Sequence, residues 1–310
     1  MNLRRTLRIG TLAIGLAATS LSLATPADAR PAPEHRAAHS CITPKGHDAA
    51  AEARGRGAGD TRAISANEQR AIRKQTHRIL ERKGHVVART SATVPVYIHK
   101  MLSASGAGDV TQAQIDAQIA ELNQDFGGQE AAGTAADTGF TFTLAGVDTY
   151  RNNQWHADKQ STSYRSRTRL GGKNALNIWL VDFNYLGIAT FPWDYARNPG
   201  IDGIRVQYSS LPGGSAANYN QGKTASHEAG HWFGLYHTFQ GGCTATNDEV
   251  SDTPAQSSST TGCPAGRDSC SLPGLDPIHN YMDYSYDSCY NQFTPGQSTR
   301  MDTMWAAYRA

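Results

Sequence analysis

The sequence predicts an α/β or α+β domain with a regular first part and a loop-rich, disulfide-crosslinked last part. Three observations support this fold class. Segments with strand-like and helix-like apolar spacing alternate between residues 93 and 234. Gly, Pro and Ser are then frequent from 238 to 294. Four of the five cysteines lie in that stretch: Cys243, Cys263, Cys270 and Cys289.

Residues 1–29 have the pattern of an export signal. Arg4, Arg5 and Arg8 precede a 16-residue apolar stretch, and Ala27-Asp28-Ala29 fits the small-x-small rule for cleavage. The apolar stretch is short for a membrane-spanning helix, which needs about 20 residues. We therefore expect a secreted, extracellular protein with no membrane anchor.

Residues 30–90 form a basic leader. They contain 13 Lys and Arg against 6 Asp and Glu, a net charge of +7, whereas residues 91–310 carry a net charge of −7. The first half is rich in Ala, Pro, Gly, Arg and His, so we expect it to be partly disordered. A helix is predicted over 65–83, where Ser65 and Glu68 form a capping box. The leader is either a flexible arm or a pro-segment that docks on the acidic body.

The body begins near residue 91 as a series of alternating elements. Period-2 alternation predicts strands, and apolar residues at helical spacing after Thr111 predict a capped helix. In chain order, the expected elements are strand 93–101, the helix from Thr111, strands 140–147, 175–183, 186–193 and 203–209, and helices 223–234 and 295–309. Pro192 places the end of strand 186–193 at a sheet edge, because proline cannot donate to a central ladder.

The four clustered cysteines predict two disulfides. The expected export signal places them in an oxidising compartment, which favours disulfides over free thiols or a cysteine zinc site. The sequence alone allows three pairings. Cys41 is the odd cysteine, and it lies far away in the basic leader.

The segment His227-Glu228-Ala229-Gly230-His231 carries the strongest chemical signal. Two histidines four residues apart lie on one helix face, where they can share a metal ion. Glu228 lies about 100° around the helix from His227, so it flanks the metal. The nearby Gly222-Lys223-Thr224 looks like the end of a phosphate-binding loop, but Ala217 stands where that loop needs glycine, so we reject a nucleotide site.

His237 can complete the site only if the helix ends before it. On an unbroken helix it would lie about 9 Å beyond His231 and off the same face. Gly234 tolerates the left-handed conformation that ends helices, so the chain can turn there and bring His237 back. Three imidazoles and one open position are typical of catalytic zinc, which acidifies bound water. Glu228 is then the expected general base.

The sequence resembles a metzincin zinc metalloprotease of the pappalysin/cytophagalysin, ulilysin-like family. The resemblance rests on HEAGHWFGLYH at 227–237, DEVSDTP at 248–254 and NYMDY at 280–284, and it extends over most of 93–310. It implies a twisted mixed sheet with an active-site helix. It also implies that His227, His231 and His237 bind zinc and that Glu228 is the base.

The resemblance implies further roles in the loop-rich part. Met282 would be the Met-turn residue beneath the metal, and Tyr284 would alternate between the metal and the substrate oxyanion. The family pairing would be Cys243 with Cys270 and Cys263 with Cys289. The family also binds calcium in this loop. The candidate oxygen ligands, which equally fit a solvated acidic turn, are Asn247, Asp248, Asp252 and Thr253.

Substrate binding follows from the same resemblance. The rim strand would pair with an extended substrate through Gly187, Ile188, Ala189 and Thr190. A preference for basic residues after the cleaved bond is implied, and Asp287 is a compatible carboxylate. Asp287 equally fits a surface or calcium-site role.

Cys41 fits a latency device in this setting. A leader thiolate could occupy the fourth zinc position and block water, although its context HSCITP departs from the family's Arg-x-Cys-Gly pattern. The alternative is a bystander thiol. Basic residues Arg82, Lys83 and Arg89 lie where processing would release a body starting near residue 90.

We therefore predict three segments: signal peptide 1–29, pro-segment 30–90 and zinc metalloprotease domain 91–310. The expected protein is a secreted, latent zinc endopeptidase, monomeric, with protein or peptide substrates and its own pro-segment as partners. The overall net charge of +2 argues against nucleic acid as a partner. Two alternatives remain: a zinc hydrolase for a non-peptide or cell-wall amide, and a non-catalytic, metal-stabilised binding protein.

Overall fold

A computed structural model describes residues 39–41, 64–84 and 91–310. The expected export signal and most of the basic leader lie outside the described residues, as does the expected processing region at 85–90. No helix in the described ranges is long and apolar enough to cross a bilayer.

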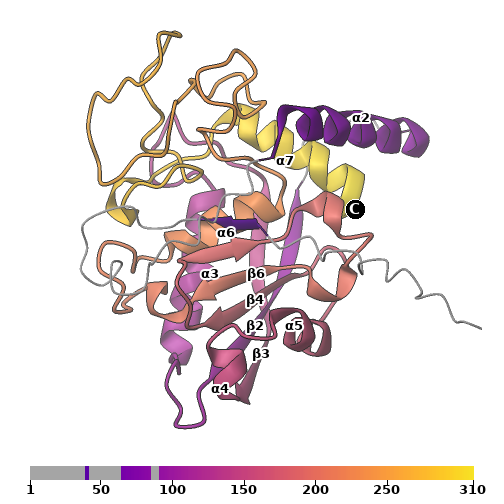
Figure 1. The fold of residues 1–310 in the computed structure, drawn as a ribbon, viewed down its shortest axis with the longest axis vertical. Helices are drawn as coiled ribbons and strands as arrows, with labels where there is room; N and C mark the ends of the chain where they lie inside the picture. Colours follow the sequence, from indigo (N-terminus) through magenta and orange to yellow (C-terminus); the bar gives the residue numbers. More distant parts are fainter. Residues whose placement is uncertain (1–38, 42–63, 85–90) are drawn as a thin grey trace, which may run out of the picture. The chain divides into compact units, whose positions relative to one another are not determined.

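The core of the fold is a mixed sheet with the strand order β1-β5-β6-β4-β2-β3 (Figure 1). Strand β5 runs antiparallel to both of its neighbours, and the remaining pairs are parallel. The strands are β1 (His39–Cys41), β2 (Ala92–Leu102), β3 (Phe140–Arg151), β4 (Leu176–Val181), β5 (Gly187–Ala189) and β6 (Ile204–Gln207). The predicted mixed α/β class is confirmed.

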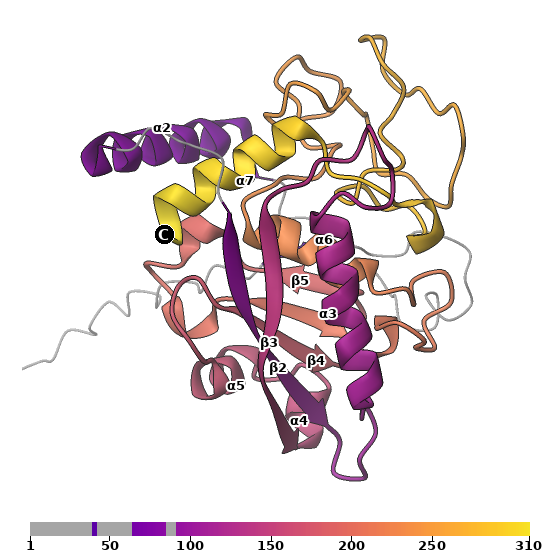
Figure 2. The same cartoon turned by 180° about the vertical axis from the view of Figure 1, so that it is seen from behind.

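Helices cover both faces of the sheet (Figures 1 and 2). Along the central strand β4, successive side chains point to opposite faces of the sheet, so each set packs against a different group of helices. In β4, Ile178 and Leu180 join the main core with side chains from α3 (Gln112–Phe126), α6 (Lys223–Trp232) and α7 (Pro295–Tyr308). Trp179 and Val181 face the other way, toward α4 (Asn153–His156) and α5 (Ser161–Thr168). All six residues of β4 are buried, as expected for a strand covered on both faces.

Two expectations about elements need correction. The strand expected over 186–193 spans only Gly187–Ala189, because Pro192 begins a short 3₁₀ turn over Pro192–Asp194. Helices α4 and α5 were not predicted. Their sequences are mostly polar and have no repeating apolar face. They are stabilised by the packing of Trp155 and Tyr164 against the sheet face that carries Trp179.

The segment between α6 and α7 is loop-rich, as predicted. Within the described residues, its regular structure is a 3₁₀ turn at Asp287–Cys289 and an isolated bridge between Asn280 and Gln292. Disulfides Cys243–Cys270 and Cys263–Cys289 crosslink it.

The leader helix α2 (Ala66–Lys83) packs against α7. Ser65 caps its first turn as predicted, by accepting a hydrogen bond from the Glu68 backbone N–H. Arg73 forms an ion pair with Glu249 at 2.8 Å, and Ile72 joins a small apolar cluster with residues of the body. The helix therefore contacts the acidic body through both charge and apolar area.

Candidate metal centre

Helix α6 places His227 and His231 on one face, one turn apart. The helix starts after Gly222, whose φ of 91° is in the left-handed region, and all its residues are buried. The Nε2 atoms of His227 and His231 lie 3.1 Å apart. The local spacing thus brings two imidazoles together.

The backbone reverses at Gly234, where φ is +100°. A Cβ at this position would lie 2.6 Å from Cγ of Met304, so space as well as conformation requires glycine. After the turn, Nε2 of His237 lies 3.1 Å from Nε2 of His231. The three histidines therefore form one group whose ligand atoms all lie within 4.8 Å of one another.

The hydrogen bonds of the first two histidines define their tautomers. Nδ1 of His227 lies 2.5 Å from the Tyr281 carbonyl oxygen, and Nδ1 of His231 lies 2.8 Å from that of Leu235. A carbonyl only accepts, so each Nδ1 carries the proton and each neutral ring turns an Nε2 lone pair to the centre. Burial lowers the pKa of His227 well below its usual value, which disfavours a proton between the rings.

A zinc ion fits this set of donors. Two nitrogens bound about 2.0–2.1 Å from a tetrahedral zinc lie roughly 3.3–3.4 Å apart, close to the observed separations. Carbonyl acceptors on the outer nitrogens orient the rings and raise their basicity, as is usual around metal-binding histidines. His237 additionally stacks on Phe239, with ring centroids 4.7 Å apart.

Glu228 is fully buried next to His227. Strand β5 approaches its carboxylate so closely that a Cβ at Gly187 would lie 2.3 Å from Oε1. Only glycine allows this approach. The expected base and the expected substrate-binding strand therefore lie side by side.

Met282 and Tyr284 both lie at the histidine cluster. A Cβ at Gly230 would lie 2.4 Å from the Met282 sulfur, so Met282 packs directly against α6 between His227 and His231. The Tyr284 ring centroid is 5.8 Å from that of His227 and 5.0 Å from that of His237. Both residues therefore lie against the histidine cluster, and their expected roles stay predictions.

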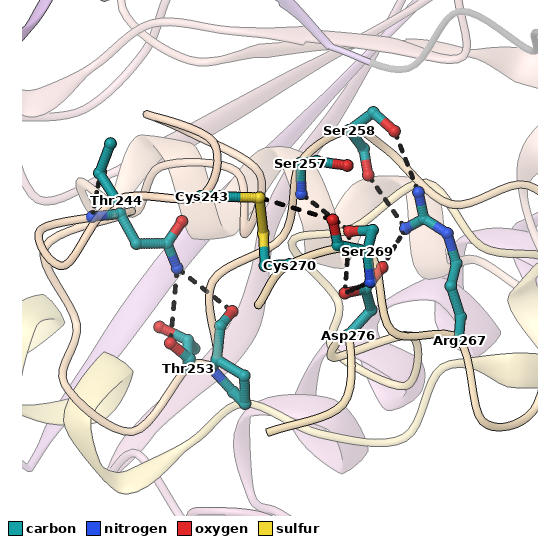
Figure 3. The surroundings of a disulfide bond; sticks show 11 residues. Cys243, Thr244, Thr253, Ser257, Ser258, Arg267, Ser269, Cys270 and Asp276 are labelled. Atoms are coloured by element: carbon teal, nitrogen blue, oxygen red, sulfur yellow. Dashed lines mark hydrogen bonds and ion pairs between the residues drawn. A yellow bond between two sulfur atoms is a disulfide. The ribbon is translucent and has the colours of Figure 1, made fainter. Parts of the chain in front are cut away.

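The two disulfides have the pairing implied by the resemblance, Cys243–Cys270 and Cys263–Cys289. Figure 3 shows the first disulfide beside a polar network in which Ser269 donates to Asp276. Arg267 pairs with Asp276 at 2.6 Å in the same network. The crosslinks thus constrain the long segment between His237 and Met282.

The structure does not bring the four candidate calcium ligands into one set. Asp248 is buried and accepts hydrogen bonds from Thr253 at 2.6 Å and from the Val250 backbone at 3.1 Å. Asp252 instead accepts from Thr294 and Gly296 at the start of α7. The carboxylate of Asp252 caps α7, whereas that of Asp248 bonds to residues of its own loop.

Asp287 is buried near the segment that precedes α6. Its Oδ2 accepts a hydrogen bond from the Gln221 backbone at 2.8 Å, and Oδ1 has no hydrogen-bond partner among the described residues. Burial raises the pKa of Asp287 to about 7. Asp287 is thus no surface carboxylate.

The outer edge of β5 pairs with the leader strand β1. The pairing is antiparallel, with Cys41 opposite Gly187 and His39 opposite Ala189. The side chain of Cys41 lies outside the described residues, so its expected role as a zinc ligand stays a prediction. Beyond the strand, Thr190 donates a hydrogen bond to Asp202 at 3.0 Å and therefore serves the fold.

Sequence reasoning missed one part of the site. Lys223 is the first residue of α6, and it makes ion pairs with Asp125 and Glu130. Tyr281, which precedes Met282, supplies the carbonyl that orients His227. The NYMDY motif marked Tyr281, but no local pattern connects it to α3.

Comparisons with known proteins agree with this geometry. The Peptidase_M43 family model, described as pregnancy-associated plasma protein-A, matches residues 180–306. An extracellular metalloprotease of Neurospora crassa is 45% identical over 236 residues, covering 74% of this chain and 80% of its own length. Extracellular metalloprotease 1 of Coccidioides posadasii is 46% identical over 226 residues, covering 70% and 78%.

Solved structures show the same fold. Mature mirolysin of Tannerella forsythia, in complex with a cleaved peptide, matches with a TM-score of 0.61 and 29% identity, covering 69% of this chain and 91% of that one. A promirolysin mutant of the same organism matches with a TM-score of 0.65 and 27% identity, covering 78% and 90%.

Proposed function

Because the chain belongs to the Peptidase_M43 (pappalysin) family of zinc metalloendopeptidases, we propose that it is secreted as a latent precursor and hydrolyses extracellular proteins with Glu228 as general base. The observation that carries this proposal is the convergence of three histidine Nε2 atoms beside a buried carboxylate.

His227, His231 and His237 would hold the zinc ion. When bound, zinc supplies Lewis acidity that acidifies a water molecule and polarises the scissile carbonyl. The Glu228 carboxylate accepts a proton from the attacking water and delivers it to the leaving amine. Tyr284 donates a hydrogen bond from its hydroxyl to the oxyanion of the substrate.

The substrate would bind as an added strand on β5. Backbone groups of Gly187, Ile188 and Ala189 would pair with it, and the close approach at Gly187 would bring the scissile bond near Glu228. Casein zymography with and without a zinc chelator tests the proposed function. Cleavage that the chelator abolishes and added zinc restores is expected, whereas hydrolysis of cell-wall amides without cleavage of protein would favour the alternative hydrolase.

We propose that residues 30–90 form the pro-segment. Support comes from the pairing of β1 with β5, which occupies the edge that the substrate would need, and from the docking of α2 on α7. Cys41 would add a thiolate at the fourth zinc position. The processing site would lie at Arg82, Lys83 or Arg89.

A Cys41→Ser substitution is expected to activate the unprocessed protein. If the thiolate contributes about 1.4 kcal/mol or more to leader binding, activity before processing rises about tenfold or more. The measurement is the initial rate on a quenched fluorescent peptide, with the processed enzyme as reference. A secreted form that begins at Arg30 and has full activity would refute latency altogether.

We propose that Asp287 selects substrates with Arg or Lys after the cleaved bond. Burial keeps its pKa near 7, with Lys223 opposing and Asp125 reinforcing the shift. The group is therefore neutral well below pH 7 and negatively charged above it. Its second oxygen, Oδ1, is buried and has no hydrogen-bond partner among the described residues, so we propose that it would pair with the basic side chain.

The ratio of kcat/KM for an Arg-containing peptide to that for its Leu analogue should rise as the pH increases through about 7. Using the ratio removes the pH dependence of the shared hydrolytic steps. Asp287→Asn should lower the ratio and make it independent of pH. An unchanged ratio in that variant would exclude Asp287 as the selecting group.

We propose a structural calcium ion at Asn247, Asp248 and Thr253, without Asp252. Asn247 Oδ1 and Asp248 Oδ2 are buried and have no hydrogen-bond partner among the described residues. Hard oxygen donors of this kind suit calcium. A higher melting temperature with calcium in the zinc-loaded protein is expected, and no shift at millimolar calcium would reject the site.

We also propose that the protein is secreted and monomeric. Relatives named extracellular metalloproteases support secretion. Fractionation of an expressing culture and light scattering of the purified protein test the two statements. Retention of the enzyme inside cells, or a mass of twice the chain, would contradict them.

A further inference from the structure

A buried charge cluster joins α3 to the start of α6. The Lys223 Nζ lies 2.7 Å from Asp125 and 2.5 Å from Glu130, and it also pairs with Glu121. Lys223 and Asp125 are almost completely buried. Three carboxylates this close could hold a metal ion, but here the Lys223 ammonium group already bonds to all three.

The same carboxylates hold the side chain of Tyr281. The Tyr281 hydroxyl lies 2.9 Å from Asp125 Oδ1 and 2.7 Å from Glu130 Oε2, and it donates one hydrogen bond shared between them. Lys223 lies 5.4 Å from the ring centroid, so it also contacts the aromatic face. Tyr281 is 1% exposed, and its far end is therefore fixed by residues of α3, of the loop that follows α3, and of α6.

The main chain of Tyr281 closes a ring of contacts back to the metal centre. Its carbonyl oxygen lies 2.5 Å from Nδ1 of His227, which is four residues after Lys223 on the same helix. The path runs from Lys223 through the carboxylates to the Tyr281 hydroxyl, and from the Tyr281 carbonyl to His227. One residue is thus held at both ends relative to the helix that carries the ligands.

A buried cluster of this kind is weak evidence for stability. Removing water from an ammonium group and several carboxylates costs several kcal/mol per ion, and apolar residues of similar size often serve stability as well. An established use of such costly groups is to hold one arrangement among several. At this location, the arrangement held is the direction of the carbonyl that orients His227.

We propose that Asp125, Glu130 and Lys223 are positioning residues for the zinc ligand His227 and act through Tyr281. The proposal rests on the proposed zinc function of the histidines. Without the hydroxyl anchor, the Tyr281 carbonyl moves more freely and holds the His227 ring less well. Outer contacts of this kind typically change metal affinity about 10–100-fold.

Tyr281→Phe tests the proposal, because it removes the hydroxyl and retains the ring and the carbonyl. The zinc dissociation constant, measured by competition with a chromophoric chelator, should rise about 10–100-fold. At saturating zinc, kcat should fall with little change in KM. The visible spectrum of the cobalt-substituted protein should also change, since it reports the geometry of the ligands.

Tyr164→Phe is the matched control. Tyr164 is also fully buried and donates its hydroxyl to a carboxylate, Asp158, at 2.6 Å, but it lies in the cluster on the other face of the sheet. The Tyr164→Phe variant should lose about as much stability as Tyr281→Phe, but it should bind zinc with unchanged affinity. Glu130→Gln, at a more exposed position, provides a second test, with a smaller loss of affinity expected because an acceptor remains.

The outcomes separate this inference from the proposed function. If Tyr281→Phe and Glu130→Gln both bind zinc as tightly as the Tyr164→Phe control, the positioning role is overturned while zinc-dependent cleavage stands. If Tyr281→Phe does not fold, unchanged zinc affinity in Glu130→Gln overturns it instead. If the unsubstituted protein binds no zinc, the proposed function itself fails.

Discussion

Glu228→Gln is expected to abolish most peptidase activity while zinc stays bound. Glutamine retains the size of the buried side chain beside Gly187 but cannot accept the proton of the attacking water. Loss of a general base typically costs about 10²–10⁴-fold, so kcat/KM on a fluorescent peptide should fall by that factor. The zinc content should remain that of the unsubstituted protein.

The control for this prediction is Asp109→Asn. Asp109 is an exposed carboxylate paired with Lys100, away from the histidine cluster, and its substitution should leave kcat/KM unchanged. Full proteolytic activity in Glu228→Gln would contradict the mechanism. A variant that binds zinc, cleaves nothing and retains every biological effect would support the non-catalytic alternative.

Of all the substitutions proposed, Asp202→Ala is expected to lower the free energy of unfolding the most. Asp202 is 1% exposed and accepts two hydrogen bonds from the Arg309 guanidinium, at 3.0 and 3.1 Å, and one from the Trp232 indole at 3.1 Å. Oδ1 of Asp202 also accepts a hydrogen bond from Thr190, next to β5. This residue therefore ties the end of α6 to the end of the rim strand.

Removing Asp202 leaves the buried Arg309 charge without its main partner. Breaking such a pair typically costs about 3–5 kcal/mol, so the free energy of unfolding in denaturant should fall by about that amount with an unchanged m-value. The double variant Asp202→Ala with Arg309→Met should recover part of the loss, because the unpaired charge is gone. A loss below about 1 kcal/mol in Asp202→Ala would contradict this assignment.

The clustering of His227, His231 and His237 was predictable because its geometry is local. Helical spacing places His227 and His231 on one face, and the only long step, to His237, depends on one glycine with an uncommon conformation. The same holds for the helix after Thr111, whose capping box forms within four residues. Short-range stereochemistry can be read directly from the sequence.

Features that depend on distant contacts could not be predicted in this way. Tyr281 and Asp125 are 156 residues apart, and no periodicity connects them. Asp252 was grouped with Asp248 because the family resemblance implies calcium in this loop, but it caps α7, whose first residues follow more than 40 positions later. The short helices α4 and α5 form because the sheet provides a surface for a few aromatic side chains.

The disulfides show what a family resemblance adds. Spacing alone allowed three pairings, and the structure has the one that the resemblance implied. The sequence predicted a strand over 186–193, and the shorter extent of β5 was not expected, although Pro192 already placed the end of this strand at a sheet edge.

The most direct test is the zinc content of the purified protein and of its His237→Ala variant. Elemental analysis after dialysis should find one zinc ion per chain in the unsubstituted protein. The variant, which retains the helix but loses the third nitrogen beyond Gly234, should retain little zinc under the same dialysis. Absence of stoichiometric transition metal from the unsubstituted protein, or full retention of zinc by His237→Ala, would contradict the three-histidine centre.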